Sequence, residues 1–221
     1  MAREYTKKEK MEIKPVVILG AGGLGKVALD IFEQNNVPVF CFLDEDAKLH
    51  NTQIGEISIM GKPDDDGFLK YIGQKCDAFV AVDDVAYKKS LVDVLKERRK
   101  VMPTNAIHEK SAISPKASLG YGNLVAQGAS LGFGTTIGHH CIVHANATID
   151  YECTVEDFVQ VGAGATINSG VTVEENVFIG SGVTIVSGIK IGKNARIAAG
   201  SVVMQEVKAG ETVIGNPAKP I

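Results

Sequence analysis

The stretch IDYECTVEDFVQVGAGATI, residues 149–167, decides the fold because an aliphatic residue returns at every sixth position. The spacing continues in both directions as seventeen consecutive hexads without an insertion. Ile, Leu or Val occupies positions 107, 113, 119, 125, 131, 137, 143, 149, 155, 161, 167, 173, 179, 185, 191, 197 and 203. A six-residue period fits neither a helix nor an ordinary strand, and a fixed short period is typical of a solenoid.

Each hexad predicts one short strand and a turn, and three hexads complete one triangular coil. The aliphatic residue is expected to point inward and to stack on its equivalent in the next coil. The residue four positions later, from Ser111 to Val207, is mostly small or β-branched and is expected to line the interior near a corner. Residues 105–221 therefore predict a parallel β-helix of between five and six coils.

The preceding part of the chain alternates strand and helix patterns. The segments KPVVILG, VPVFCFLDED and CDAFVAVDD read as buried strands, and GGLGKVALDIFEQNN and YKKSLVDVLKERRK read as helices. This order predicts a Rossmann-like parallel α/β domain over residues 13–104. Residues 1–12 are charged and have no apolar core, so they are expected to be a disordered leader and not a secretion signal.

Composition excludes several classes of function. The net charge of −3 gives no electrostatic case for binding nucleic acid or a membrane surface. No apolar run approaches the roughly 20 residues of a membrane span, so no membrane insertion is expected. The four cysteines show no metal-binding or disulfide spacing, and buried free thiols of a cytoplasmic protein are the expectation.

The loop GAGGLG, residues 20–25, follows a strand and opens a helix. Backbone N–H groups there can hold a phosphate, so residues 20–23 (Gly20, Ala21, Gly22, Gly23) are candidate substrate ligands. Asp44 and Glu45 end the second strand, where a carboxylate can accept from a ribose or a base. A purely structural turn and a solvated strand end stay open as alternatives. The domain is too short for a complete dinucleotide fold, so NAD is not favoured.

Taken together, VVILGAGGLGKVALDIFE, FLDED, AIHEKSAISPKASLG, ATIDYEC and VIGNPAKPI resemble the hexapeptide-repeat sugar acetyltransferases of the sialic-acid O-acetyltransferase and UDP-amino-sugar N-acetyltransferase family. The resemblance implies a left-handed β-helix, a homotrimer, acetyl-CoA as co-substrate and no metal ion. It also implies a nucleotide-activated sugar as acceptor, acetylated on an amino or hydroxyl group during surface glycan synthesis.

The resemblance also assigns candidate residues around the two ligands. Asp83 joins the nucleotide-sugar side, after the third strand. Gln160 and Ser169 fall near the thioester, and Lys219 falls near a CoA phosphate. Gly180 and Ser181 are further candidates on the thioester side, and Ala199 and Gly200 fall further along the pantetheine groove.

The chain departs from the family's pattern at the position of the catalytic base. Tyr151 stands where the family has its catalytic histidine, and Gln160 replaces a second histidine, although Glu152 remains. Leu24 and Asp83 are further departures beside the phosphate loop. Tyrosine, with a reference pKa of about 10, is a poor base at neutral pH.

His144 is the candidate replacement for the missing base. Because the family site lies between subunits, His144 of one chain could face Tyr151 of its neighbour, with Glu152 supporting it. The expected catalytic group is therefore His144, Tyr151 and Glu152.

Two alternatives use the same residues differently. The missing histidine is compatible with a non-catalytic member that binds a nucleotide sugar or CoA. His139 and His144 also have the spacing of the zinc histidines in γ-class carbonic anhydrases. The third histidine on that face, His108, lies two coils away, roughly 9–10 Å at the spacing of β-strands, which is too far for a shared ion.

Overall fold

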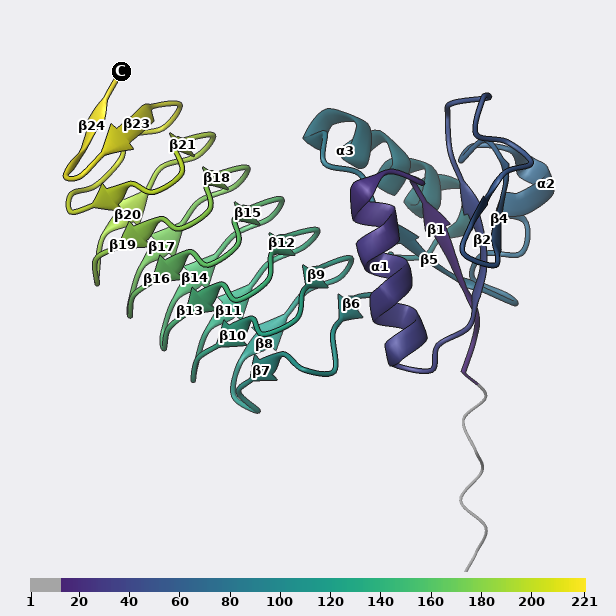
Figure 1. The fold of residues 1–221 in the computed structure, drawn as a ribbon, viewed down its shortest axis with the longest axis horizontal. Helices are drawn as coiled ribbons and strands as arrows, with labels where there is room; N and C mark the ends of the chain where they lie inside the picture. Colours follow the sequence, from purple (N-terminus) through teal and green to yellow (C-terminus); the bar gives the residue numbers. More distant parts are fainter. Residues whose placement is uncertain (1–12) are drawn as a thin grey trace, which may run out of the picture.

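The computed structural model describes residues 13–221, and the leader expected at residues 1–12 lies outside the described residues. The chain forms two domains side by side (Figure 1). An α/β domain lies against the first coils of a β-helix, and the C-terminus lies at the far end of that helix. The Rossmann-like sheet and the left-handed β-helix are both confirmed.

The N-terminal sheet has the order β3-β4-β2-β1-β5. Its strands are β1 (Val16–Leu19), β2 (Val39–Leu43), β3 (Gln53–Ile54), β4 (Ile57–Gly61) and β5 (Asp77–Val80). The pairs β1–β2, β1–β5 and β2–β4 are parallel, and β3 joins β4 as an antiparallel hairpin. The helices are α1 (Gly23–Gln34), α2 (Asp66–Leu69) and α3 (Val85–Val94), which runs on as a π-helical turn at Leu95–Arg99.

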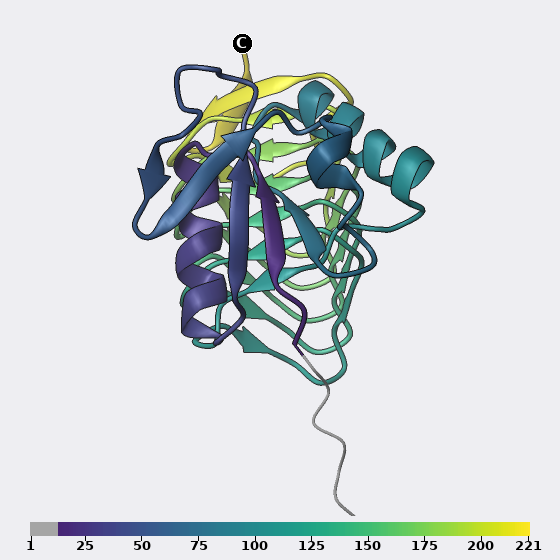
Figure 2. The ribbon, with the colours of Figure 1, turned by 90° about the vertical axis from the view of Figure 1, so that its right-hand side faces the viewer.

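Strand β1 is apolar throughout because both faces of the sheet are covered. One face packs on α1 and on the first β-helix coils, through residues such as Ile18, Phe42 and Phe79. The other face packs on α2 and α3, through residues such as Leu19, Leu43 and Leu91. Figure 2 shows the sheet in front of the stacked coils. The three predicted strands are present, and the hairpin of β3 and β4 was not predicted.

The β-helix contains seventeen two-residue strands, one for each predicted hexad. They are β6 (Ala106–Ile107), β7 (Ala112–Ile113), β8 (Ser118–Leu119), β9 (Leu124–Val125), β10 (Ser130–Leu131), β11 (Thr136–Ile137), β12 (Ile142–Val143), β13 (Thr148–Ile149), β14 (Thr154–Val155), β15 (Gln160–Val161), β16 (Thr166–Ile167), β17 (Thr172–Val173), β18 (Phe178–Ile179), β19 (Thr184–Ile185), β20 (Lys190–Ile191), β21 (Arg196–Ile197) and β22 (Val202–Val203). Every strand ends on the predicted aliphatic residue. A closing hairpin, β23 (Thr212–Gly215) and β24 (Ala218–Pro220), extends the face that begins with β6.

Every third strand stacks on the same parallel face, so the solenoid has three faces and three corners. From β10 to β22 the aliphatic residues are almost fully buried, and Cys141 and Cys153 fill interior positions beside them. All four cysteines are free and buried. Within residues 13–221, no helix combines the length and the apolar character needed to cross a membrane.

The corners differ in what they face, and each takes its name from its neighbour. The α1 corner comprises residues 144–146, 162–164, 180–182 and 198–200. The α3 corner comprises residues 138–140, 156–158, 174–176 and 192–194. The far corner, opposite the N-terminal domain, comprises residues 132–134, 150–152, 168–170 and 186–188. The face between the α1 and α3 corners, formed by β6, β9, β12, β15, β18 and β21, meets the N-terminal domain.

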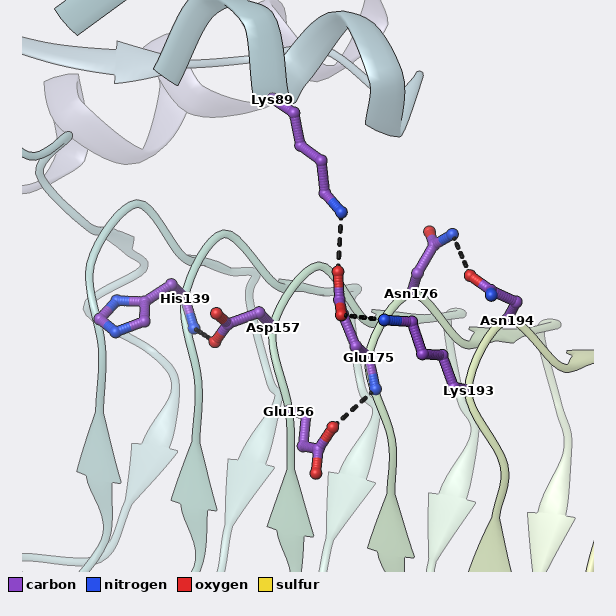
Figure 3. A network of polar contacts seen from close by, with 8 residues as sticks. All are labelled: Lys89, His139, Glu156, Asp157, Glu175, Asn176, Lys193 and Asn194. Atoms are coloured by element: carbon purple, nitrogen blue, oxygen red, sulfur yellow. Dashed lines mark hydrogen bonds and ion pairs between the residues drawn. The ribbon is translucent and has the colours of Figure 1, made fainter. Parts of the chain in front are cut away.

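The two domains are joined by apolar and polar contacts. Leu124 and Ile142 project from the β-helix into the apolar cluster that contains α1. At the α3 corner, Lys89 Nζ lies 2.7 Å from Glu175 Oε1, and Glu175 also binds Lys193 (Figure 3). These contacts fix the edge of the N-terminal sheet over coils that carry candidate site residues.

Candidate active site

The predicted phosphate loop, residues 20–25 between β1 and α1, has two tightly packed glycines and two open ones. Gly20 has φ +112°, and a Cβ there would lie 2.5 Å from the Ala81 carbonyl oxygen, while a Cβ on Gly25 would collide with the Gly20 carbonyl. A Cβ on Gly22 or Gly23 would meet nothing within 4 Å. No side chain caps α1, so its first N–H groups and the space above Gly22 and Gly23 remain available to an anion.

Asp44 supports this loop from the end of β2. Its Oδ2 accepts from the Ala21 N–H at 2.7 Å, and its Oδ1 accepts from the Asp46 N–H at 2.9 Å. If Asp44 binds a ribose or base as predicted, it must do so with a carboxylate that already accepts hydrogen bonds from the Ala21 and Asp46 N–H groups.

Glu45 belongs to a separate cavity of about 220 Å³ between the loop after β4 and α3, which it shares with Tyr87 and Lys62. Burial, and then Glu45, raises the pKa of Tyr87 to about 12, so this phenol stays protonated. Glu45 and the phosphate loop are thus placed at neighbouring strand ends, as parallel strands require.

Asp83 follows β5 and meets the β-helix directly. Its backbone carbonyl accepts from Gln160 Nε2 at 2.9 Å, across 77 positions of sequence. Beside this contact lies a cavity of about 310 Å³. Its walls include Asp83, Val85, Gln160, Phe178 and Arg196.

His144 lies at the α1 corner immediately after β12 and is half-buried. Burial is the main cause that lowers its pKa; the Asp83 carboxylate raises it and the Lys88 ammonium lowers it. A histidine that stays neutral near pH 7 can accept a proton. The fold thus brings His144, Gln160 and Asp83 to one seam between the domains.

Tyr151 and Glu152 lie elsewhere, at the far corner. The Tyr151 side chain is 51% exposed. Glu152 has φ +56°, and its N–H donates to the Phe133 carbonyl at 2.8 Å. Ser169 follows one coil later, where its Oγ donates to Ser187 Oγ at 3.2 Å. Strand β13 separates this corner from His144, so one chain alone does not bring together all three catalytic candidates.

Four of the acetyl-CoA candidates, Gly180, Ser181, Ala199 and Gly200, form a column of small residues at the α1 corner. Gly180 packs against the Ala199 backbone, and the Gly200 N–H donates to the Ser181 carbonyl at 2.9 Å. Gly180 is buried, whereas Ser181, Ala199 and Gly200 are exposed at the surface of this corner. Lys219 lies in β24, paired with Ile214 at the last coil.

Two groups near the seam were missed by the sequence analysis. Lys88 is 3% exposed on the inner side of α3, and Arg196 lies 4.7 Å from the centroid of the Phe178 ring at the cavity wall. Lys88 shares a helix face with Leu91 and Leu95, so the helical period could have indicated its burial. Arg196 gives no comparable signal, since residues at its hexad position range from buried, as at Leu124, to exposed, as at Lys190.

The zinc alternative finds no support in the geometry. The ring of His139 stacks on Tyr121 and its Nδ1 accepts from the Tyr121 N–H at 2.9 Å, at the α3 corner. His144 lies beyond β12 at the α1 corner. Across residues 13–221, no group of three or more His, Cys, Asp or Glu side chains could hold a metal ion.

Comparisons with protein families agree with the two-domain organisation. Residues 15–95 match the PglD N-terminal domain. Residues 152–187 and 170–205 match the bacterial transferase hexapeptide, a model of six repeats. Comparison with curated protein sequences gives no significant match.

Solved structures resemble nearly the whole chain. A histidine-to-alanine variant of GDP-perosamine N-acetyltransferase from Caulobacter crescentus, in complex with CoA and GDP-perosamine, is 27% identical with a TM-score of 0.85, over 95% of this chain and 98% of that one. The acetyltransferase domain of PglB from Neisseria gonorrhoeae, in complex with acetyl coenzyme A, is 24% identical with a TM-score of 0.86, over 95% and 100%. WeeI from Acinetobacter baumannii is 24% identical with a TM-score of 0.80, over 94% and 99%.

The likenesses at 24% identity establish the fold, and the Caulobacter enzyme adds a relative that was crystallised with CoA and a nucleotide sugar. The chain therefore combines a match to the PglD N-terminal domain with matches to the bacterial transferase hexapeptide, and it resembles the Caulobacter enzyme over nearly its whole length.

Proposed function

We propose that the protein transfers an acetyl group from acetyl-CoA to an amino group of a nucleotide-activated sugar. The observation that carries this proposal is the seam itself. An uncapped helix N-terminus with open glycines, suited to a diphosphate, belongs to the same domain whose Asp83 accepts a hydrogen bond from Gln160 and acts by its charge on His144. The Caulobacter relative, with CoA and GDP-perosamine bound, supports an amino sugar as the acceptor class, with a hydroxyl as the alternative.

The reaction needs a base, an acceptor and a stabilised oxyanion. The sugar nitrogen attacks the thioester carbonyl carbon, and His144 takes the proton that the nitrogen loses. The carbon–sulfur bond then breaks, and the CoA thiolate leaves and takes a proton from the imidazolium. Backbone N–H groups of the β-helix turns would stabilise the oxyanion. The products are the acetamido sugar and free CoA.

The active assembly is a homotrimer in this proposal. His144 and Gln160 lie at the seam, whereas Tyr151 and Glu152 lie at the far corner of the same chain. Side-by-side packing of three β-helices would place the far corner of one chain near the seam of its neighbour. The neighbour would then supply Tyr151 and Glu152 to complete the site. We place the enzyme in the cytoplasm, where its four thiols would stay reduced.

A CoA-release assay with a panel of UDP- and GDP-linked amino sugars tests the function. Thiol release that depends on both acetyl-CoA and one amino sugar is the expected result, with the matching hydroxy sugar as control. If calorimetry shows CoA binding but no amino sugar or hydroxy sugar is acetylated, the transferase proposal is wrong. The non-catalytic alternative would then be preferred. The tyrosine at position 151, where the family has its catalytic histidine, supports that alternative.

A further inference from the structure

Arg196 is an unpaired cation at the wall of the seam cavity, the space of about 310 Å³ between the start of α3 and the β-helix. Its guanidinium carbon lies 4.7 Å from the centroid of the Phe178 ring on the preceding coil. Within residues 13–221 it forms no ion pair, whereas Lys89 and Lys193 near the α3 corner both bind Glu175 (Figure 3). A guanidinium held over an aromatic ring without a carboxylate partner keeps N–H donors available to an anion.

Three successive coils build the β-helix wall of this cavity. Gln160 pairs in register with Phe178, and Phe178 pairs in register with Arg196, so the three residues form a row on one face. Their chemistry changes along the row from an amide through an aromatic ring to a guanidinium. Gln160 Nε2 already donates to the Asp83 carbonyl oxygen at 2.9 Å. Arg196 is therefore the charged donor that this wall offers to a ligand.

The opposite wall, at the start of α3, carries carboxylates. Asp84 caps the helix, where its Oδ1 accepts from the Tyr87 N–H at 2.7 Å. Asp83 is exposed, and in the described part of the chain its carboxylate forms no ion pair. A simple anion would be attracted by Arg196 and repelled by both carboxylates. The cavity instead suits a ligand with a cationic group on one side and an anionic group on the other.

The cavity adjoins the predicted phosphate loop. Strands β1 and β5 are parallel neighbours, so the loops that follow them open at the same edge of the sheet. The two loops are in contact there, since a Cβ on Gly20 would lie 2.5 Å from the Ala81 carbonyl oxygen and 3.0 Å from Val82 Cγ1. Asp83 comes next in the chain and lines the cavity. A nucleotide sugar whose diphosphate occupies the phosphate loop would therefore extend its sugar toward the cavity.

We propose that Arg196 binds a carboxylate on the acceptor sugar, so that the substrate is a nucleotide-linked amino sugar acid. This inference rests on the proposed function, which supplies the amino group and assigns the diphosphate to the phosphate loop. The sugar amine, which is an ammonium until it is deprotonated, faces Asp83, and the carboxylate of the same sugar faces Arg196. A guanidinium and a carboxylate can form two parallel N–H···O bonds, which gives the contact its specificity for a planar anion.

Calorimetric titration of the full-length protein tests this assignment without requiring turnover. The probes are UDP- and GDP-linked amino sugars that differ only in the group at C6, which is a carboxylate, a hydroxymethyl or a methyl group. The wild type should bind the acid about 10–100-fold more tightly than either neutral sugar, the usual range for a hydrogen bond to a charged group. Arg196→Met should remove that preference, and Arg196→Lys should restore part of it.

Lys190→Met is the matched control, because Lys190 is an exposed cation at the same hexad position on another face of the β-helix. It should leave the preference for the acid unchanged. If the wild type binds the acid no more tightly than the neutral sugars, or if Arg196→Met keeps the preference, the proposal is wrong. Arg196→Gln takes the place of Arg196→Met if that variant does not fold.

Titrations with UDP, GDP and CoA identify which anion Arg196 meets. Their affinities should be the same in Arg196→Met and the wild type. A loss of affinity for one of them would assign the guanidinium to a phosphate and overturn the proposal.

The binding data also separate this inference from the proposed function. If the acid is preferred through Arg196 but no sugar is acetylated, the transferase function fails and the assignment of Arg196 stands. If Arg196→Met acetylates the acid and the neutral amino sugars as the wild type does, the function stands and the assignment fails.

Discussion

At the scale of single residues, Tyr151 and His144 are the two candidates for the base of the proposed transfer. Tyr151 is half exposed at the far corner. His144 is half-buried and less readily protonated than an ordinary histidine. His144 is the better candidate for the base because burial favours its neutral imidazole, which can accept a proton.

His144→Gln should lower kcat by about 10²–10⁴-fold, the usual contribution of a general base, with little change in the affinity for CoA. Because burial lowers the pKa of His144, wild-type kcat/KM should rise with pH through a midpoint below the ordinary histidine value. Steady-state CoA release between pH 5 and 8 measures both effects.

His139→Gln is the matched control for this prediction. His139 sits at the other end of β12, where its ring already accepts a hydrogen bond from Tyr121. Its loss should leave kcat within about twofold of the wild type, because surface substitutions away from a site usually have small effects. Equal rates in His144→Gln and wild type would rule out the relocated base and favour attack by an amine that is already neutral.

The glycines of the phosphate loop separate folding from binding. Gly25→Ala forces a Cβ into the Gly20 carbonyl, so it should destabilise the protein by about 1–3 kcal/mol. Gly22→Ala places its methyl group in open space with an ordinary φ of −75°, so stability should change little while the space for a phosphate shrinks. Urea denaturation and titration with a nucleotide sugar distinguish the two variants. Loss of stability in Gly22→Ala, with unchanged sugar binding, would show that the loop is only structural.

Among the site residues, the sequence could indicate chemistry but not distance. The order of glycines predicts a phosphate loop, and these residues lie at the turn from β1 into α1. The contact of Gln160 with Asp83 could not be predicted, because it depends on how two separately folded domains dock. Lys88 was missed for the same reason: its helix face was readable, but the partner surface was not.

At the scale of elements, the sequence predicted the strands that belong to a regular six-residue repeat and missed those that do not. Every hexad became a strand because the aliphatic residue of each one stacks on its equivalent eighteen positions away, so the signal repeats with each coil. The hairpin β3–β4 has no such repetition. Its strand β3 has only two residues and is followed by a turn at Gly55. Short elements whose pairing depends on a neighbouring strand leave little trace in the sequence.

The ion pair between α3 and the α3 corner gives a prediction about stability. Hydrogen bonds from Lys193 and then Lys89 lower the pKa of Glu175. The lowered pKa contributes stability above the unfolded-state pKa of about 4.3, and that stability is lost as pH falls through the folded-state value. Since both partners are partly exposed, Glu175→Gln should cost at most about 1 kcal/mol at pH 7.

Denaturation at pH 7 and at pH 3, for the wild type and Glu175→Gln, measures this contribution. The difference between the two proteins should shrink in acid and in high salt. Glu109→Gln, an exposed glutamate outside the described ion pairs, should show no difference at either pH. A cost that persists unchanged in acid would assign Glu175 a packing role instead.

At the scale of the whole molecule, the position of the catalytic candidates on two corners predicts a shared site. His144 lies at the seam with the N-terminal domain of its own chain, near Asp83, whereas Glu152 lies at the far corner. In a closed ring of three chains, one chain would provide the phosphate loop and His144, and the next chain would provide Tyr151 and Glu152. Light scattering should first give three times the mass of one chain.

Mixed trimers test which chain supplies each group. A chain with Gly23→Asp, whose carboxylate would repel the diphosphate, is co-assembled in equal amounts with a chain carrying Glu152→Gln. Only pairs with an intact loop in one chain and Glu152 in the next are active, so about a quarter of the wild-type activity per site should return on random assembly in the ring. Co-assembly of Gly23→Asp with His144→Gln should restore none, because the loop and His144 serve the same site from the same chain. Recovery in that second mixture would place His144 in the neighbour's site. If the wild-type protein is active and trimeric but neither mixture recovers activity, the whole site lies within one chain.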